Sequence, residues 1–366
     1  MVMSHCQSPL DLFKFASTCK ALQKIYKNLE QLRSAKKNIF RGGIASNLRN
    51  RFGAVACPDY CYSVARYRRL RHEFDGLSLA KIEKVIRARF LDATVPHERS
   101  AKDLFHIPRA LDDAEVLVNA FVAEAWKNVD AFKALGYLRP GYEAKIIVLT
   151  PSEKARFLKS VFQYQHYCHM FFYKDEILFS MNTLLRRQFF KVQHGDLTEV
   201  LRFHSIVAFI STFYRGIVDT MRCTPVSEIR ALGSKETVEY FLSSSFIEII
   251  RFVHYLLCNG MRMFAKVCTR DPYSRTKFLL KEFYKIKITR HPAITVSGFD
   301  VADQGTHGEK TWTPWPYTEE VLKSEFDPAL RSAIMFWDRE RLENVEKAAA
   351  PKTLEGDEKT EPQTPS

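Results

Sequence analysis

Apolar side chains recur every three or four residues over most of this chain, the spacing that places them on one face of an α-helix. The clearest stripe lies at 112–135, where the residues sharing one side are Val116, Leu117, Ala120, Phe121 and Val129. Gly136 follows where a C-terminal cap is expected. The pattern therefore predicts a long amphipathic helix at 112–135.

A second strong signal is Thr150-Pro-Ser-Glu153, a capping box with proline just inside the helix start. Proline and glycine predict irregular connections at 93–108 and 290–317. The same periodicity predicts further helices at 11–37 (two short ones), 60–70, 78–91, 177–190, 197–218, 227–232, 236–268, 272–286 and 319–342. We therefore predict an all-α fold, with 236–268 as one long buried helix.

The helical pattern divides the chain into four predicted regions. A short helical hook at 1–40 is followed by a basic helical linker region at 41–108 and a large, irregular helical domain at 109–344. In the tail at 345–366 the residues after Val345 include no large apolar residue except Leu354, a composition typical of disorder.

Composition narrows the class of protein. Hydrophobic residues make up 46% of the 366, and the 28 phenylalanines favour a thick core. No stretch reaches the roughly 18–20 apolar residues of a membrane span, and the nearest, 205–218, fits a buried core helix. The N-terminus lacks the pattern of a secretory signal, and the eight cysteines lie mostly in apolar helical patterns. These features predict reduced thiols, no membrane partner, and a cytoplasmic or nuclear location.

The positive charge is concentrated near the N-terminus. Of the net charge of +13, the stretch 11–89 carries 18 basic and 6 acidic residues, a local balance of +12. The stretch 338–366 carries 5 basic and 8 acidic residues, a balance of −3. This asymmetry indicates an acidic partner for the front of the chain, or contact between its two ends.

Motifs for catalysis and cofactor binding are absent from the sequence. It contains no phosphate-binding glycine loop, no nucleophile elbow and no His-Glu-x-x-His. Cys57 and Cys61 have a zinc-compatible spacing but no second pair, and His166-Tyr-Cys-His169 favours core or boundary histidines over a metal site. We expect no enzyme activity, no cofactor and no metal.

A basic cluster provides a candidate polyanion-binding site. Its residues are Arg66, Arg68, Arg69 and Arg71, with Tyr60, Tyr62 and Tyr67 available to stack on bases. A solvated helix face is the preferred interpretation, and nucleic-acid association is the alternative.

The opening segment carries a resemblance to a known family. Residues 3–23 resemble the second half of an F-box, with matching positions at Ser8, Pro9, Asp11, Leu12, Ala16, Cys19, Lys20 and Leu22. The first half of that motif has no counterpart, so the resemblance is to an N-terminally truncated F-box. Segments at 152–172 and 336–342 are similar to uncharacterised F-box-like proteins of filamentous fungi.

The resemblance implies docking on a Skp1-type adaptor of a cullin ubiquitin ligase, while the rest of the chain recognises a protein substrate. The partner-binding residues it implies are Pro9, Leu10, Leu12, Phe13 and Leu22. We therefore predict a protein–protein interaction protein. Its more specific predicted role is that of a substrate adaptor of a ubiquitin ligase. A nucleic-acid-associated helical protein and an enzyme with an unrecognised site are the alternatives.

Overall fold

The computed structural model describes residues 58–88, 106–132, 148–173, 176–179, 197–289 and 333–341, with positions 20, 24, 185 and 189. Of the residues described, 85% are helical and 1% lie in strands, which confirms the predicted all-α class. The predicted hook at 1–40, with the exception of Lys20 and Lys24, and the predicted tail at 345–366 lie outside the described residues.

The basic region forms two helices joined by a short 3-10 turn. Helix α4 spans Pro58–Leu70, η2 spans Arg71–Phe74 and α5 spans Leu79–Ile86. Ser78 is the N-terminal cap residue of α5, with extended backbone but without a capping hydrogen bond from its side chain. The predicted helices at 60–70 and 78–91 are thus present, the second one described as a shorter α-helix.

The long helix α7 spans Ile107–Phe132 and starts five residues before the prediction. Pro108 was predicted to end a loop, but it lies in the first turn of the helix. Proline is tolerated there because the amide N–H groups of the first turn have no partner inside the helix.

Helix α8 spans Pro151–Phe171 and begins as predicted. The Thr150 side chain accepts a hydrogen bond from the Glu153 amide, and the Glu153 carboxylate accepts one from the Thr150 amide. The capping box is therefore confirmed.

Residues 197–289 form a series of helices, in which the single long helix predicted at 236–268 is wrong. Helix α10 spans Leu197–Cys223 and contains the apolar segment 205–218, and α11 spans Val226–Arg230. In place of one helix there are three: α12 Lys235–Ser243, α13 Phe246–Cys258 and α14 Gly260–Cys268. The series ends with α15, Pro272–Thr289.

Local capping chemistry causes the two breaks. Ser245 caps α13 in a second capping box with Glu248, which stops α12 from continuing. At the other end Gly260 has a φ of 68°, a backbone conformation that glycine adopts without strain.

Two further helix predictions are wrong in part. The short strands β1 (Phe172–Tyr173) and β2 (Glu176–Ile177) pair antiparallel, so the helix predicted at 177–190 is wrong at 177–179, whereas Leu185 and Phe189 are helical. In the predicted helix 319–342, Ile334–Phe336 form the 3-10 turn η6, followed by non-helical Trp337 and Asp338. Phe336 and Trp337 instead pack on Phe157, so tertiary contacts override the periodicity.

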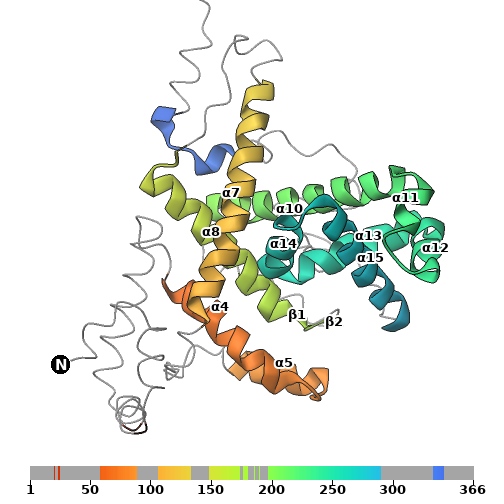
Figure 1. The fold of residues 1–366 in the computed structure, drawn as a ribbon. Coiled ribbons are helices and arrows are strands. Elements are labelled where there is room, and N and C mark those ends of the chain that lie inside the picture. Colours follow the sequence, from red (N-terminus) through yellow and green to blue (C-terminus); the bar gives the residue numbers. More distant parts are fainter. Residues whose placement is uncertain are drawn as a thin grey trace, which may run out of the picture.

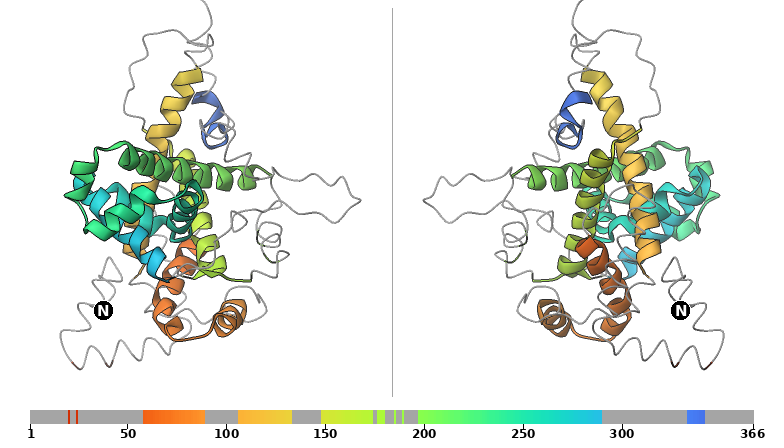
Figure 2. Two further views of the ribbon diagram at one scale, coloured as in Figure 1. Left: turned by 90° about the vertical axis from the view of Figure 1, so that its right-hand side faces the viewer. Right: turned by 90° about the vertical axis from the view of Figure 1, so that its left-hand side faces the viewer.

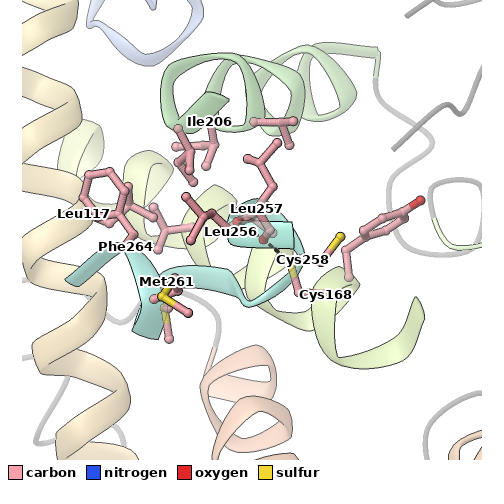
Figure 3. Close-up of a cluster of buried hydrophobic side chains, with 14 of the residues drawn as sticks. Leu117, Cys168, Ile206, Leu256, Leu257, Cys258, Met261 and Phe264 are labelled. Atoms are coloured by element: carbon pink, nitrogen blue, oxygen red, sulfur yellow. Dashed lines mark hydrogen bonds between the residues drawn. The ribbon is translucent and has the colours of Figure 1, made fainter. Parts of the chain in front are cut away.

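The helices surround one apolar core. Helix α8 packs against both α7 and α10 and runs obliquely to α7 in Figure 1, while α13–α15 gather on one side of the molecule in Figures 1 and 2. Helix α4 packs against the first part of α7, where Arg68 meets Asp113, and Trp337 packs against the last part at Trp126. Figure 3 shows the centre, where side chains from α7, α8, α10, α13 and α14 meet, including Leu117, Cys168, Ile206, Leu256, Leu257, Cys258, Met261 and Phe264.

The N-terminus of α8 is closed by the segment 333–341, far away in sequence. The Asp338 carboxylate accepts hydrogen bonds from Thr150, Ser152 and Arg156. Arg341 donates to the fully buried carboxylate of Glu153 at 2.7 and 2.8 Å. We call this arrangement the α8 clasp.

Among the described helices, none is alone long and apolar enough to cross a membrane. Helices α12 and α13 meet the length and composition criteria only as a pair, and they are bent by 111° at the break between them.

Candidate anion-binding site

A cavity of about 320 Å³ lies where four segments of the chain converge. These are the end of α4 with η2, the start of α7, the end of α8 with β1, and the corner between α13 and α14. Arginine is its dominant charged residue: Arg68, Arg71, Arg109 and Arg262 all line it. We call it the arginine pocket.

Arg68 forms the most buried charged part of the pocket. Its side chain is 9% exposed, and Nη2 donates a hydrogen bond of 2.6 Å to Asp113. The other terminal nitrogen, Nη1, is buried and has no hydrogen-bond partner among the described residues. Burial lowers the pKa of Arg68, while Asp113 partly offsets this effect. A buried guanidinium with an unpaired N–H donor gains a strong hydrogen bond when an anion binds to it.

Arg262 on α14 also lines the pocket, and its surroundings resemble those of Arg68. Its Nε is also buried and has no hydrogen-bond partner among the residues described. Burial lowers the pKa of Arg262, and the positive charges of Arg109 and Arg71 lower it further. The arginines therefore lie close enough to repel one another, a repulsion that an anion between them would relieve.

An aromatic wall borders the arginines. The ring of His169 stacks on Tyr67, with centroids 4.0 Å apart and planes at 10°. Burial, together with Arg68 and Arg71, holds the pKa of His169 well below its usual value near 6.5. This imidazole is therefore neutral at pH 7, and its buried Nδ1 has no hydrogen-bond partner within the described part of the chain.

The surrounding backbone is fixed by polar contacts. Gln165 on α8 accepts a 2.7 Å hydrogen bond from the Met261 amide, which anchors the start of α14 beside the pocket. On the opposite side, the Tyr173 hydroxyl donates to Asp75 at 3.0 Å. These hydrogen bonds fix the position of the elements that line the pocket. Arg109 and Asp75 are the exposed residues of its described lining.

The four arginines predicted from the sequence separate into two groups. Arg68 and Arg71 line the pocket, whereas Arg69 pairs with Glu73 on the surface at 3.3 Å and Arg66 is half-buried outside the lining. The predicted partner-binding residues Pro9, Leu10, Leu12, Phe13 and Leu22 lie outside the described residues.

Sequence reasoning missed Arg109 and Arg262. Arg109 lies just before the helix predicted at 112–135, Arg262 lies inside the helix predicted at 236–268, and the two are 153 positions apart in the printed numbering. A weak signal exists, since Asn259-Gly260 marks a corner and Arg262 follows two positions after the glycine. Only the packing of α7 against α14 brings the two arginines together.

The cysteines and histidines considered as zinc ligands have other surroundings. Cys61 is fully buried, and burial raises the pKa of its thiol to about 12. His166 shares a 2.8 Å hydrogen bond with Ser63, and His169 stacks on Tyr67. Within the described ranges, no three histidine, cysteine or acidic residues converge as a metal-ligand set. Cys57 and His97 lie outside those ranges.

A larger hollow of about 470 Å³ lies between α7, α10 and α15. Its charged lining residues are Glu124, Lys127 and Arg275. Glu124 pairs with Lys127, and Arg275 donates to the carbonyls of Val267 and Arg270. The arginine pocket, with unused buried donors, is therefore the stronger candidate site.

Comparisons of the chain with protein-family models, with curated proteins and with solved structures find no match. The resemblance of residues 3–23 to an F-box stays a sequence-based prediction.

Proposed function

We propose that this is a non-catalytic protein–protein interaction protein that holds an anionic group of its partner in the arginine pocket. The observation that carries the proposal is the buried Nη1 of Arg68, which has no acceptor among the described residues although the side chain is nine-tenths buried. Burying a charged donor without a partner costs several kcal/mol in general. An anionic group of a partner that accepts a hydrogen bond from Arg68 would offset this cost.

The identity of the charged groups supports anion recognition over a catalytic role. Arginine stays protonated at pH 7 and offers fixed donors that match carboxylate and phosphate oxygens. His169 stays neutral, and the thiol of Cys168 in the same lining is buried with its pKa raised well above normal by that burial. The pocket therefore supplies charge and hydrogen bonds rather than a nucleophile or a base.

Nucleic-acid association is the alternative that the sequence suggested. A nucleic acid needs a basic surface that follows many phosphates. Arg69 is engaged with Glu73, and Arg68 and Arg71 line a small concavity, which favours one anionic group over a long polyanion.

Substrate adaptor of a cullin ubiquitin ligase is the more specific form of the proposal. It rests on the F-box resemblance of residues 3–23, with the arginine pocket as the substrate-binding end. A pull-down with a Skp1-type adaptor should retain the chain and lose it on Leu12→Asp. Retention unaffected by that change, or no retention, would remove the ligase role without touching the pocket.

The anion-binding proposal is tested by calorimetry with citrate, sulfate and inorganic phosphate as probes. At least one should bind the full chain, and Arg262→Gln should weaken that binding at least tenfold, because it removes a charge from the lining. Arg230→Gln is the matched control, since Arg230 is an exposed arginine on α11. If no probe binds, or if both variants bind alike, the proposal is wrong.

A further inference from the structure

The balance of charge in the arginine pocket narrows the class of anion. The lining contributes four guanidinium groups, from Arg68, Arg71, Arg109 and Arg262. Two carboxylates oppose them: Asp75 in the lining and Asp113, which pairs with Arg68. With His169 neutral, four positive and two negative charges leave a net charge of +2.

The donors also approach from different directions. Arg68 comes from α4, Arg71 from η2, Arg109 from α7 and Arg262 from α14. A phosphate group offers three terminal oxygens to guanidinium donors from several elements, whereas a carboxylate offers two. Arg68 Nη1 and Arg262 Nε are both buried without a hydrogen-bond partner among the described residues, so two of the four guanidinium groups keep an unpaired donor.

The size of the cavity limits what else can enter. About 320 Å³ accommodates a phosphate with a short side chain, and it lies at the lower end of the range for small-molecule pockets. The stacked rings of Tyr67 and His169, together with Phe172, give the cavity an apolar wall against which a short carbon chain can pack. A double-stranded nucleic acid or a membrane surface is too large to enter.

We infer that the arginine pocket binds a phosphate monoester dianion. This inference rests on the proposed function, because it names the anion that the same pocket takes. A phosphate monoester carries close to two negative charges at pH 7 and three strong acceptor oxygens, which match the net charge and the converging donors.

The test compares three small probes by calorimetry on the full chain at pH 7.5: methyl phosphate, dimethyl phosphate and succinate. Methyl phosphate is the monoester dianion, dimethyl phosphate has one charge fewer, and succinate is a dianion made of carboxylates. Methyl phosphate should bind at least tenfold more tightly than either of the others. Arg262→Gln should remove that preference, and Arg230→Gln should keep it.

Further arms identify the source of the phosphate. Inorganic phosphate, a short phosphoserine peptide and a nucleoside 5′-monophosphate are titrated in the same way, with the unphosphorylated peptide as control. Whichever binds most tightly must depend on Arg262. Where Arg262→Gln does not fold, as judged by circular dichroism, Arg109→Gln replaces it, because Arg109 is exposed at the mouth of the pocket.

The outcomes separate the two proposals. If succinate or dimethyl phosphate binds as tightly as methyl phosphate in an Arg262-dependent way, the phosphate inference is wrong and anion recognition stands. If a single-stranded oligonucleotide binds more tightly than every monoester, and Arg262→Gln leaves that binding unchanged, the inference is wrong as well. If none of the probes binds, both proposals fail.

Discussion

Single residues decide where the backbone of this protein can turn and which groups meet at the pocket. Gly260 is the sharpest case, since it starts α14 with a φ of 68° directly beside Gln165. A Cβ atom at this position would lie 2.3 Å from Gln165 Oε1, the atom that accepts the Met261 amide. The glycine is required by both its backbone conformation and its neighbour.

We expect Gly260→Ala to destabilise the protein by about 2–3 kcal/mol, because alanine strains the left-handed backbone and displaces Gln165. Urea unfolding followed by circular dichroism measures this change. The matched control is Gly216→Ala in the interior of α10, where a Cβ would meet nothing within 4 Å. That variant should be stabilised by up to about 1 kcal/mol, and equal effects in both variants would contradict the explanation.

Thiol reactivity follows burial. Burial raises the pKa of Cys61 to about 12, whereas Cys223 at the end of α10 is exposed. We expect iodoacetamide at pH 8 to label Cys223 in minutes and to leave Cys61 unlabelled in the native protein, because only the thiolate reacts. Peptide mass mapping reads out each site, and labelling in urea is the control in which both must react. Rapid native labelling of Cys61 would show that α4 is not packed as described.

At the scale of elements, the sequence predicted most helices and failed where packing or capping competed with periodicity. The capping box at Thr150 was readable because every residue it needs lies within four positions. A second box at Ser245 and Glu248 was equally readable but was hidden by the continuous apolar stripe through 236–268. The paired strands β1 and β2 have only two residues each, too few for alternation to be visible.

The α8 clasp is an element-scale feature that no local pattern predicts. Asp338 lies 182 positions from Arg156, with which it forms a 2.5 Å hydrogen bond. That bond, followed by the one from Thr150, lowers the pKa of Asp338 to about 2. Burial raises the pKa of Glu153, but the hydrogen bonds from Arg341, Asp338 and Thr150 outweigh it and the net pKa is lowered.

The clasp gives stability a defined pH dependence. Because the folded-state pKa of Asp338 is below its unfolded value near 3.9, its contribution is present above about pH 4 and is lost as the pH falls through about 2. Since its side chain is 28% exposed, we expect Asp338→Asn to destabilise the protein by only about 1–2 kcal/mol at pH 7.

Urea titrations at pH 7, 4 and 2.5 check this expectation. The difference between Asp338→Asn and the unaltered protein should shrink steadily towards acid. Glu124→Gln is the control, because its exposed pair with Lys127 at 3.5 Å contributes little, and it should stay within about 0.5 kcal/mol at every pH. A difference that grows towards acid would contradict the assigned direction of the pKa.

At the scale of the whole molecule, the arginine pocket could be predicted only in part. Arg68 and Arg71 were recognisable because they lie three positions apart in a basic run. Arg109 and Arg262 became part of the site only through packing of α7 and α14, and a single sequence holds no signal for such a contact. The acidic partner that charge balance predicts for the front of the chain stays a prediction, and of the four pocket arginines only Arg68 and Arg71 belong to that basic stretch.

Several contacts join residues on the two sides of the predicted boundary between the basic linker region at 41–108 and the domain at 109–344. In α4, Ser63 bonds to His166 on α8, Tyr67 stacks on His169, and Arg68 pairs with Asp113 on α7. The buried residues of α4 and α5 also belong to the same core cluster as those of α7 and α8. These contacts argue that α4 is needed for the rest of the molecule to fold.

We therefore expect the fragment 109–344 to lose the sharp urea transition of the longer chain 1–344. Without α4, the polar groups of Asp113, His166 and His169 lose partners, and the apolar faces of α7 and α8 that packed against it are exposed to water. The fragment should show a shallower transition, and its unfolding slope should fall because less surface is buried. The chain 1–344 should unfold like the full chain, because Val345 and Leu354 are the only branched aliphatic residues in the sequence removed beyond it. If 109–344 unfolds with the midpoint and slope of 1–344, the boundary near Pro108 separates two independent parts, and the arginine pocket is then an interface between them.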